Sequence, residues 1–158
     1  MERFAVASPL GSLTVTLDGD NITRLEFPHS PRNGKLARPA GTPASPAGAR
    51  VAAALETYFA GGDPGLLELR PDGTAFQQRV WDALRAVPAG ETATYGELAA
   101  KAGSPRAARA VGQACARNPI PLLIPCHRAV GASGPGGWSG LPGAKEWLLQ
   151  HEASRAMW

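Results

Sequence analysis

Two helix-start motifs in the second half of the chain fix where its helices can begin. Thr74-Ala75-Phe76-Gln77 and Thr94-Tyr95-Gly96-Glu97 each place a threonine three residues before Gln or Glu, which is the pattern of a capping box. In such a box the Thr hydroxyl accepts a backbone N–H and the Gln or Glu side chain accepts the N–H of the Thr. The first box is followed by apolar residues at helical spacing, which predict a buried stripe: Phe76, Val80, Leu84 and Val87.

The second box opens a short predicted helix that runs to Lys101, and another helix follows after a tight turn. Gly103 suits the positive φ at a helix C-terminus, Ser104 suits an N-cap, and Pro105 suits the first helical position. The second helix is expected to run to about Ala116. Two short helices joined this way predict a DNA-binding helix-turn-helix, although an ordinary αα-hairpin fits the same pattern.

The charge distribution favours a polyanionic partner for this half of the chain. Residues 1–73 carry 7 basic and 8 acidic side chains, whereas residues 74–158 carry 9 and 5, which accounts for the net charge of +3. Between positions 98 and 144 there are five basic residues and no acidic one. Such a stretch is typical of nucleic-acid-binding surfaces, although a solvated basic surface has the same composition.

The helix predicted after Gly103 is rich in small residues, with Arg106 and Arg109 projecting from it. A smooth surface allows close approach to a groove, but it offers few groups that can read base edges. This composition favours minor-groove binding with little sequence specificity. The small residues are Ala107, Ala108, Ala110, Gly112 and Ala114.

The first half has the alternation of a small antiparallel sheet. Residues 13–17 alternate apolar and Thr side chains, residues 18–21 form a turn, and residues 22–27 return. Further predictions are a strand at 4–7, a mobile Pro- and Gly-rich loop at 28–50, an amphipathic helix at 51–59 and a short strand at 66–69. The expected fold is therefore α+β, with a small sheet-and-helix domain (1–73) followed by a mainly helical domain (74–158) that contains the helix-turn-helix.

Residues 118–128 contain the chemically most informative segment. An apolar run at 122–124, framed by prolines, is predicted to be a strand that leads into Cys126-His127. A thiol acts as a nucleophile only when deprotonated, and neighbours in an extended chain face opposite ways, so a water between Cys126 and His127 is expected. An acid would then orient the imidazole. An unreactive buried thiol fits Cys126 equally well, and Cys115 is expected only to pack in the core.

Five segments together resemble the O6-alkylguanine-DNA alkyltransferases. The resemblance is close over residues 74–152, whereas residues 1–73 are compatible with that family's smaller domain but carry no motif of it. The matching segments are Arg106–Gly112, Asn118-Pro119, Pro125–Arg128, Gly137–Gly140 and Lys145–Glu152.

The resemblance implies a role for each matching residue. Cys126 would accept the alkyl group, His127 would act as base through water, and Glu152 would orient His127. Asn118 would tie the helix-turn-helix to the active-site segment, and Tyr95 would donate a hydrogen bond to guanine N3. Further residues of the implied site are Lys145, the Ser139 backbone, the wall residue Trp138, and the carbonyls of Cys126 and Ala129. Arg109 would fill the stack of a flipped base, and the remaining implied substrate- and DNA-binding residues are Arg106, Ala107, Pro121 and Arg128.

The resemblance also implies the overall activity. The chain would transfer alkyl groups from O6-alkylguanine, and from O4-alkylthymine, in double-stranded DNA to Cys126, inactivating itself in one turnover. We expect a cytoplasmic monomer with no cofactor, no metal and no membrane association. Trp138 stands where the family usually has tyrosine, which bears on the size of alkyl group accepted. Two alternatives remain: a non-enzymatic binder of alkylated DNA, and a cysteine hydrolase that uses Cys126.

Overall fold

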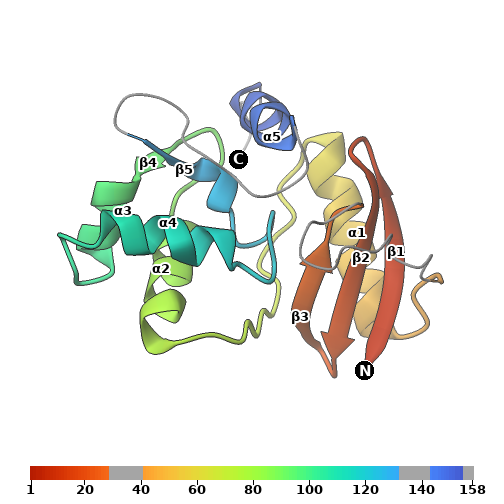
Figure 1. The fold of residues 1–158 in the computed structure, drawn as a ribbon. Helices are drawn as coiled ribbons and strands as arrows, with labels where there is room; N and C mark the ends of the chain where they lie inside the picture. The colour runs from red at the N-terminus through yellow and green to blue at the C-terminus, as the bar shows by residue number, and fades with distance from the viewer. Residues whose placement is uncertain (29–40, 132–142, 155–158) are drawn as a thin grey trace.

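The computed structural model describes residues 1–28, 41–131 and 143–154 (Figure 1). Its first half contains an antiparallel sheet in the order β1-β2-β3, which confirms the predicted hairpin and third strand. The alternating residues of β2 point one set of apolar side chains, Leu13, Val15 and Leu17, into the core. The strands are β1 (Glu2–Ser8), β2 (Gly11–Asp18) and β3 (Asn21–Glu26).

Helix α1 (Pro46–Ala60) lies against this sheet and begins earlier than predicted (Figure 1). Ser45 caps it by accepting the N–H of Gly48, and Pro46 supplies a preset φ in the first turn. Residues 46–50 are therefore helical and do not belong to a loop, while 29–40 lie outside the described residues. The predicted strand at 66–69 was also wrong, because it reduces to a single bridge between Ile22 and Leu69.

The second half is mainly helical, and both predicted helix starts are confirmed. Thr74 and Thr94 each make the two reciprocal hydrogen bonds of a capping box. The overall class is therefore α+β, as expected. Its elements are α2 (Ala75–Arg85), β4 (Ala93–Thr94), α3 (Tyr95–Lys101), α4 (Ala108–Ala116), the 3-10 turn η1 (Cys126–Arg128), β5 (Ala129–Val130) and α5 (Ala144–Ala153).

Helix α4 begins at Ala108, three residues later than the predicted start at Pro105. The N–H of Ser104 donates to the carbonyl of Ala99 (2.9 Å) and that of Gly103, with φ 82°, to Ala100 (3.1 Å). These two bonds form a Schellman motif that ends α3, so the backbone of Ser104 completes that helix. No side chain caps α4.

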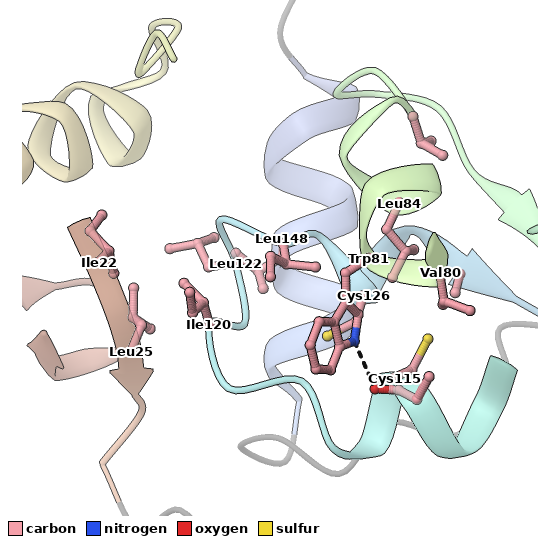
Figure 2. Close-up of a cluster of buried hydrophobic side chains, with 14 of the residues drawn as sticks. Ile22, Leu25, Val80, Trp81, Leu84, Cys115, Ile120, Leu122, Cys126 and Leu148 are labelled. Atoms are coloured by element: carbon pink, nitrogen blue, oxygen red, sulfur yellow. Dashed lines mark hydrogen bonds between the residues drawn. The ribbon is translucent and has the colours of Figure 1, made fainter. Parts of the chain in front are cut away.

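The buried apolar side chains of the two halves form one continuous cluster. Figure 2 shows Ile22 and Leu25 of β3 facing Ile120 and Leu122 of the segment before Cys126. The N–H of Leu25 also donates to the carbonyl of Pro119 (3.0 Å). The boundary at residues 73/74 stays a prediction. Among the described residues, no helix is long and apolar enough to cross a membrane.

The indole of Trp81 links α2 to α4 and provides a test of this packing. Its side chain is 1% exposed, and Nε1 donates to the carbonyl of Ala114 at 3.0 Å (Figure 2). Trp81→Phe removes the donor and part of the buried ring, so we expect the free energy of unfolding to fall by about 2 kcal/mol or more. Urea unfolding measures this. Half-exposed Trp147→Phe is the control, and an equal loss in both variants would contradict the assignment.

Candidate active site

The segment before Cys126 is a tight loop and not the predicted strand. Leu122 has a positive φ of 78°, and the N–H of Ile124 donates back to Ile120 (2.9 Å). Pro125, with φ −80° and ψ 66°, forms an inverse γ-turn in which the N–H of Cys126 donates to Ile124 (2.7 Å). A short apolar run cannot reveal such a turn, since the turn depends on one residue in the left-handed region.

Asn118 holds this loop in place. Its Nδ2 donates to the carbonyl of Ile124 at 2.8 Å, and its Oδ1 accepts the N–H of Ile120 at 2.9 Å. Because Asn118 follows α4 almost directly, its buried amide connects the end of that helix to the residues that position Cys126. These contacts have the geometry that the predicted linking role requires.

The buried carboxylate of Glu152, on α5, contacts the polar side chains of the two residues that follow Cys126. Glu152 is 0% exposed, and its Oε2 lies 2.8 Å from Nε2 of His127. Arg128 donates to both carboxylate oxygens, from Nε at 2.8 Å and from Nη2 at 3.0 Å. Burial raises the pKa of Glu152, but hydrogen bonds and charge from His127 and Arg128 outweigh it and lower the pKa to about 2. Glu152 is therefore an anion at neutral pH.

His127 is fully buried and neutral. Burial lowers the pKa of His127 below its ordinary value, the Glu152 hydrogen bond and charge oppose this, and the charges of Arg128 and Lys145 reinforce it. The carboxylate next to Nε2 selects the tautomer that carries its proton there. Nδ1 is then the acceptor, and it has no hydrogen-bond partner among the described residues. The ring can thus take a proton at Nδ1 and share the resulting charge with Glu152.

The thiol of Cys126 is 2% exposed, and two polar side chains lie near it. Burial lowers the pKa of Lys145, while the nearby Cys126 and Cys115 raise it. Nζ of Lys145 donates to the carbonyl of Ala129 at 2.7 Å. Tyr95 is half-buried at the start of α3. Burial and the charges of Cys115 and Cys126 raise the pKa of Tyr95.

The second thiol differs from the first in its surroundings. Burial and the charge of Cys126 raise the pKa of Cys115 to about 12, with Lys145 opposing weakly. Figure 2 shows Cys115 on α4 beside Trp81, packed among apolar side chains. It is therefore protonated at neutral pH, in keeping with the packing role expected for it.

The predicted DNA-binding residues differ in how far their side chains are exposed. Arg106, in the turn before α4, and Arg109, in its first turn, are exposed, while Ala107 and Pro121 are half-buried. Arg128 differs from the prediction: it is 7% exposed, and its Nη1 donates to the carbonyl of Val87 at 2.6 Å while the rest of the guanidinium holds Glu152. These internal contacts use one donor on each guanidinium nitrogen and hold the side chain inside the protein.

Trp138 and Ser139 lie outside the described residues. Among the residues that are described, no three His, Cys, Asp or Glu side chains gather as metal ligands. The expectation that no metal takes part stays a prediction.

One residue of this cluster carries no signal in the sequence. Tyr58 of α1 is 2% exposed, and its hydroxyl donates to Oε2 of Glu152 at 2.6 Å. In the sequence it occupies the apolar side of an amphipathic helix, and no motif in residues 1–73 distinguishes it from an ordinary core residue.

Comparison with known proteins gives the family. The model described as 6-O-methylguanine DNA methyltransferase, DNA binding domain, matches residues 75–154. Methylated-DNA–protein-cysteine methyltransferase of Mycobacterium bovis is 44% identical over 156 residues, covering 96% of this chain and 92% of that protein. The protein of that name from Methanosarcina acetivorans is 52% identical over 103 residues, covering 63% of this chain and 65% of its own length.

A solved structure agrees over the whole fold. The crystal structure of Mycobacterium tuberculosis OGT in complex with DNA superposes with a TM-score of 0.83 at 40% identity, covering 99% of this chain and 96% of that one. The sequence and fold similarity thus extend well beyond the matched domain into the N-terminal sheet. The chain therefore belongs to the O6-methylguanine-DNA methyltransferase family.

Proposed function

We propose that this protein repairs DNA by transferring an alkyl group from O6 of guanine to Sγ of Cys126. The observation that carries the proposal is the buried His127–Glu152 pair directly next to a buried thiol. The names of the relatives, methylated-DNA–protein-cysteine methyltransferases, support the same chemistry. DNA as the partner is supported by the DNA-bound M. tuberculosis relative and by the matched DNA-binding domain.

The transfer step uses the groups around Cys126 as follows. The thiol proton moves through a water to Nδ1 of His127, and Glu152 stabilises the imidazolium. The thiolate attacks the alkyl carbon, an S–C bond forms, and the O6–C bond breaks with its electron pair left on the purine. Tyr95 donates to N3 of the departing guanine, where a hydrogen bond strengthens as negative charge develops.

The product of this step is a stable thioether. The described residues offer no group placed to cleave it, so each molecule would react once. Cys126 and Cys115 are both free thiols, which fits a reducing compartment such as the cytoplasm.

DNA recognition would rely on shape and phosphates. A base must leave the stack to reach the buried thiol, which costs a few kcal/mol, and Arg109 is exposed on α4 where it can fill the vacated space. The small residues of α4 suit close approach in the minor groove with little sequence preference. We propose that the protein acts as a monomer, also accepts O4-alkylthymine, and uses Trp138 and Ser139 to line the alkyl pocket.

Methyl transfer to Cys126 is the direct test. After incubation with duplex DNA containing O6-methylguanine, mass spectrometry should find one added methyl group on the Cys126 peptide. Cys126→Ser should gain none, while Cys115→Ser, which removes the other thiol, should still be methylated. Binding of the DNA without any methylation of the wild type would identify a non-enzymatic binder. Turnover of an ester or amide beyond one equivalent would identify a hydrolase.

Arg109→Ala tests the filling of the stack. We expect repair of duplex DNA to slow about tenfold or more, because the unstacking cost of a few kcal/mol is no longer offset. Reaction with free O6-benzylguanine should be nearly unchanged, since no base is flipped. Arg117→Ala, which removes an exposed arginine at the other end of α4, is the control for net charge. Equal losses on both substrates would refute this role.

Glu152→Gln tests the relay. Methyl transfer should slow about 100-fold, in the range of general-base effects, with DNA affinity unchanged. Because folding lowers the pKa of Glu152 from 4.5 to about 2, its charge contributes stability that is present above about pH 4.5 and lost as pH falls towards 2. The stability gap between wild type and variant should therefore shrink over that interval in urea unfolding.

The control for this variant is Glu146→Gln, on the exposed side of the same helix. It should leave the transfer rate unchanged. A normal transfer rate in Glu152→Gln would exclude Glu152 from the relay.

A further inference from the structure

The phenol of Tyr58 shares an acceptor with the proposed catalytic base. Its hydroxyl donates to Oε2 of Glu152 at 2.6 Å, and Nε2 of His127 lies 2.8 Å from the same oxygen. Tyr58 comes from α1, 94 positions earlier in the chain, so this contact joins the N-terminal half to the relay. All three side chains are buried, and water therefore does not weaken the coupling between them.

We propose that Tyr58 is a positioning residue through which the N-terminal half lowers the proton affinity of His127. This proposal rests on the proposed function only in taking His127 as the base. It assigns to the first half a direct part in setting the reactivity of Cys126, beyond its share of the core.

The negative charge on Oε2 of Glu152 is shared among three hydrogen-bond donors. This oxygen accepts from Tyr58, from His127 and from Nη2 of Arg128 at 3.0 Å. Each donor stabilises part of the charge and leaves less to attract a proton on the imidazole. With the phenol removed, the same carboxylate would stabilise an imidazolium more strongly, and His127 would bind its proton more tightly.

The other charged and titratable groups near His127 lie on η1 and α5. Arg128 lies on η1, while Glu152 and Lys145 lie on α5; Glu152 favours the imidazolium, and the two cations disfavour it. Cys126 precedes His127 on η1. Replacing Tyr58 by phenylalanine changes none of these charges, so a change in His127 titration reports on the phenol hydroxyl.

The position of Tyr58 is fixed by the seam between α1 and α5. Nε2 of His151 donates to the carbonyl of Tyr58 at 2.8 Å. The Tyr58 ring packs edge-on against Phe59, with centroids 5.0 Å apart, and lies 5.3 Å from the His151 ring. The hydroxyl is therefore directed at Glu152 by contacts that Tyr58→Phe leaves in place.

Titration of His127 by NMR in Tyr58→Phe tests the proposal without any alkyl transfer. We expect the titration midpoint of His127 to rise by about 0.5 to 1 pH unit, since hydrogen bonds to charged groups are stronger than those between neutral groups and part of this stabilisation is transferred to the imidazolium. The acid limb of the methyl-transfer pH profile should move in the same direction. Thermal unfolding checks that the variant is folded.

Trp147→Phe is the matched control. It also changes the α1–α5 contact, where the Trp147 and Phe59 ring centroids lie 6.0 Å apart, but it leaves the contacts of Tyr58 with His151 and Glu152 in place. Its His127 midpoint should stay at the wild-type value. Equal shifts in the two variants, or no upward shift in Tyr58→Phe, would overturn the proposal and leave Tyr58 a packing residue.

A shift of the His127 midpoint in the opposite direction can also be tested. The chain has only two tyrosines, Tyr58 and Tyr95, so position 58 can be labelled selectively. In a Tyr95→Phe background, 3-fluorotyrosine labels position 58 alone and makes its phenol a stronger donor. The His127 midpoint should then fall, and a rise or no change would count against the proposal. Failure of wild-type protein to accept methyl groups would refute the proposed repair activity while this titration still decides the role of Tyr58.

Discussion

Removing a carboxylate from water is strongly unfavourable unless its oxygens are fully hydrogen-bonded, and Glu152 meets that condition through three other side chains. Arg128 supplies the counter-charge, while His127 and Tyr58 complete the coordination of Oε2. Those partners come from α1 and η1, and Glu152 comes from α5, so the three elements must be packed together before the carboxylate is fully hydrogen-bonded. The relay thus depends on the tertiary structure, and its Tyr58–Glu152 hydrogen bond in turn joins the two halves.

The parts of the fold that the sequence predicted are those governed by local physical chemistry. Both capping boxes act through residues three apart, and the alternation of 13–17 follows the period-two pleat of a single strand, in which Thr14 and Thr16 are buried as well. The loop at Leu122 could not be predicted, since its positive φ occurs in a segment held by the side-chain amide of Asn118 and by packing against the distant strand β3. Helix α4 begins at Ala108 and not at the predicted Pro105. This later start likewise reflects the Schellman motif at the end of α3, in which the N–H of Ser104 takes part.

The candidate site divides in the same way. Cys126 and His127 were evident because they are adjacent, and Glu152 came from resemblance to a family motif. Arg128 was misassigned to the DNA surface because a basic residue in a basic segment gives no indication that its partner is a buried glutamate. Tyr58 was missed because a tyrosine on an apolar helix face is usually a core residue, and only the folded structure reveals what its hydroxyl touches.

The placement of charges supports the proposed proton transfer between a buried thiol and a buried imidazole at neutral pH. The transfer creates two opposite charges in a region with little water, which is unfavourable by itself. Each new charge lies near a charge of opposite sign. Lys145 is near the Cys126 thiolate, and Glu152 contacts the His127 imidazolium. Arg128 and Tyr58 limit how strongly Glu152 attracts the proton, so His127 stays neutral until the Cys126 thiol gives up its proton. The same carboxylate therefore stabilises the reactive ion pair without fixing the base in its charged form.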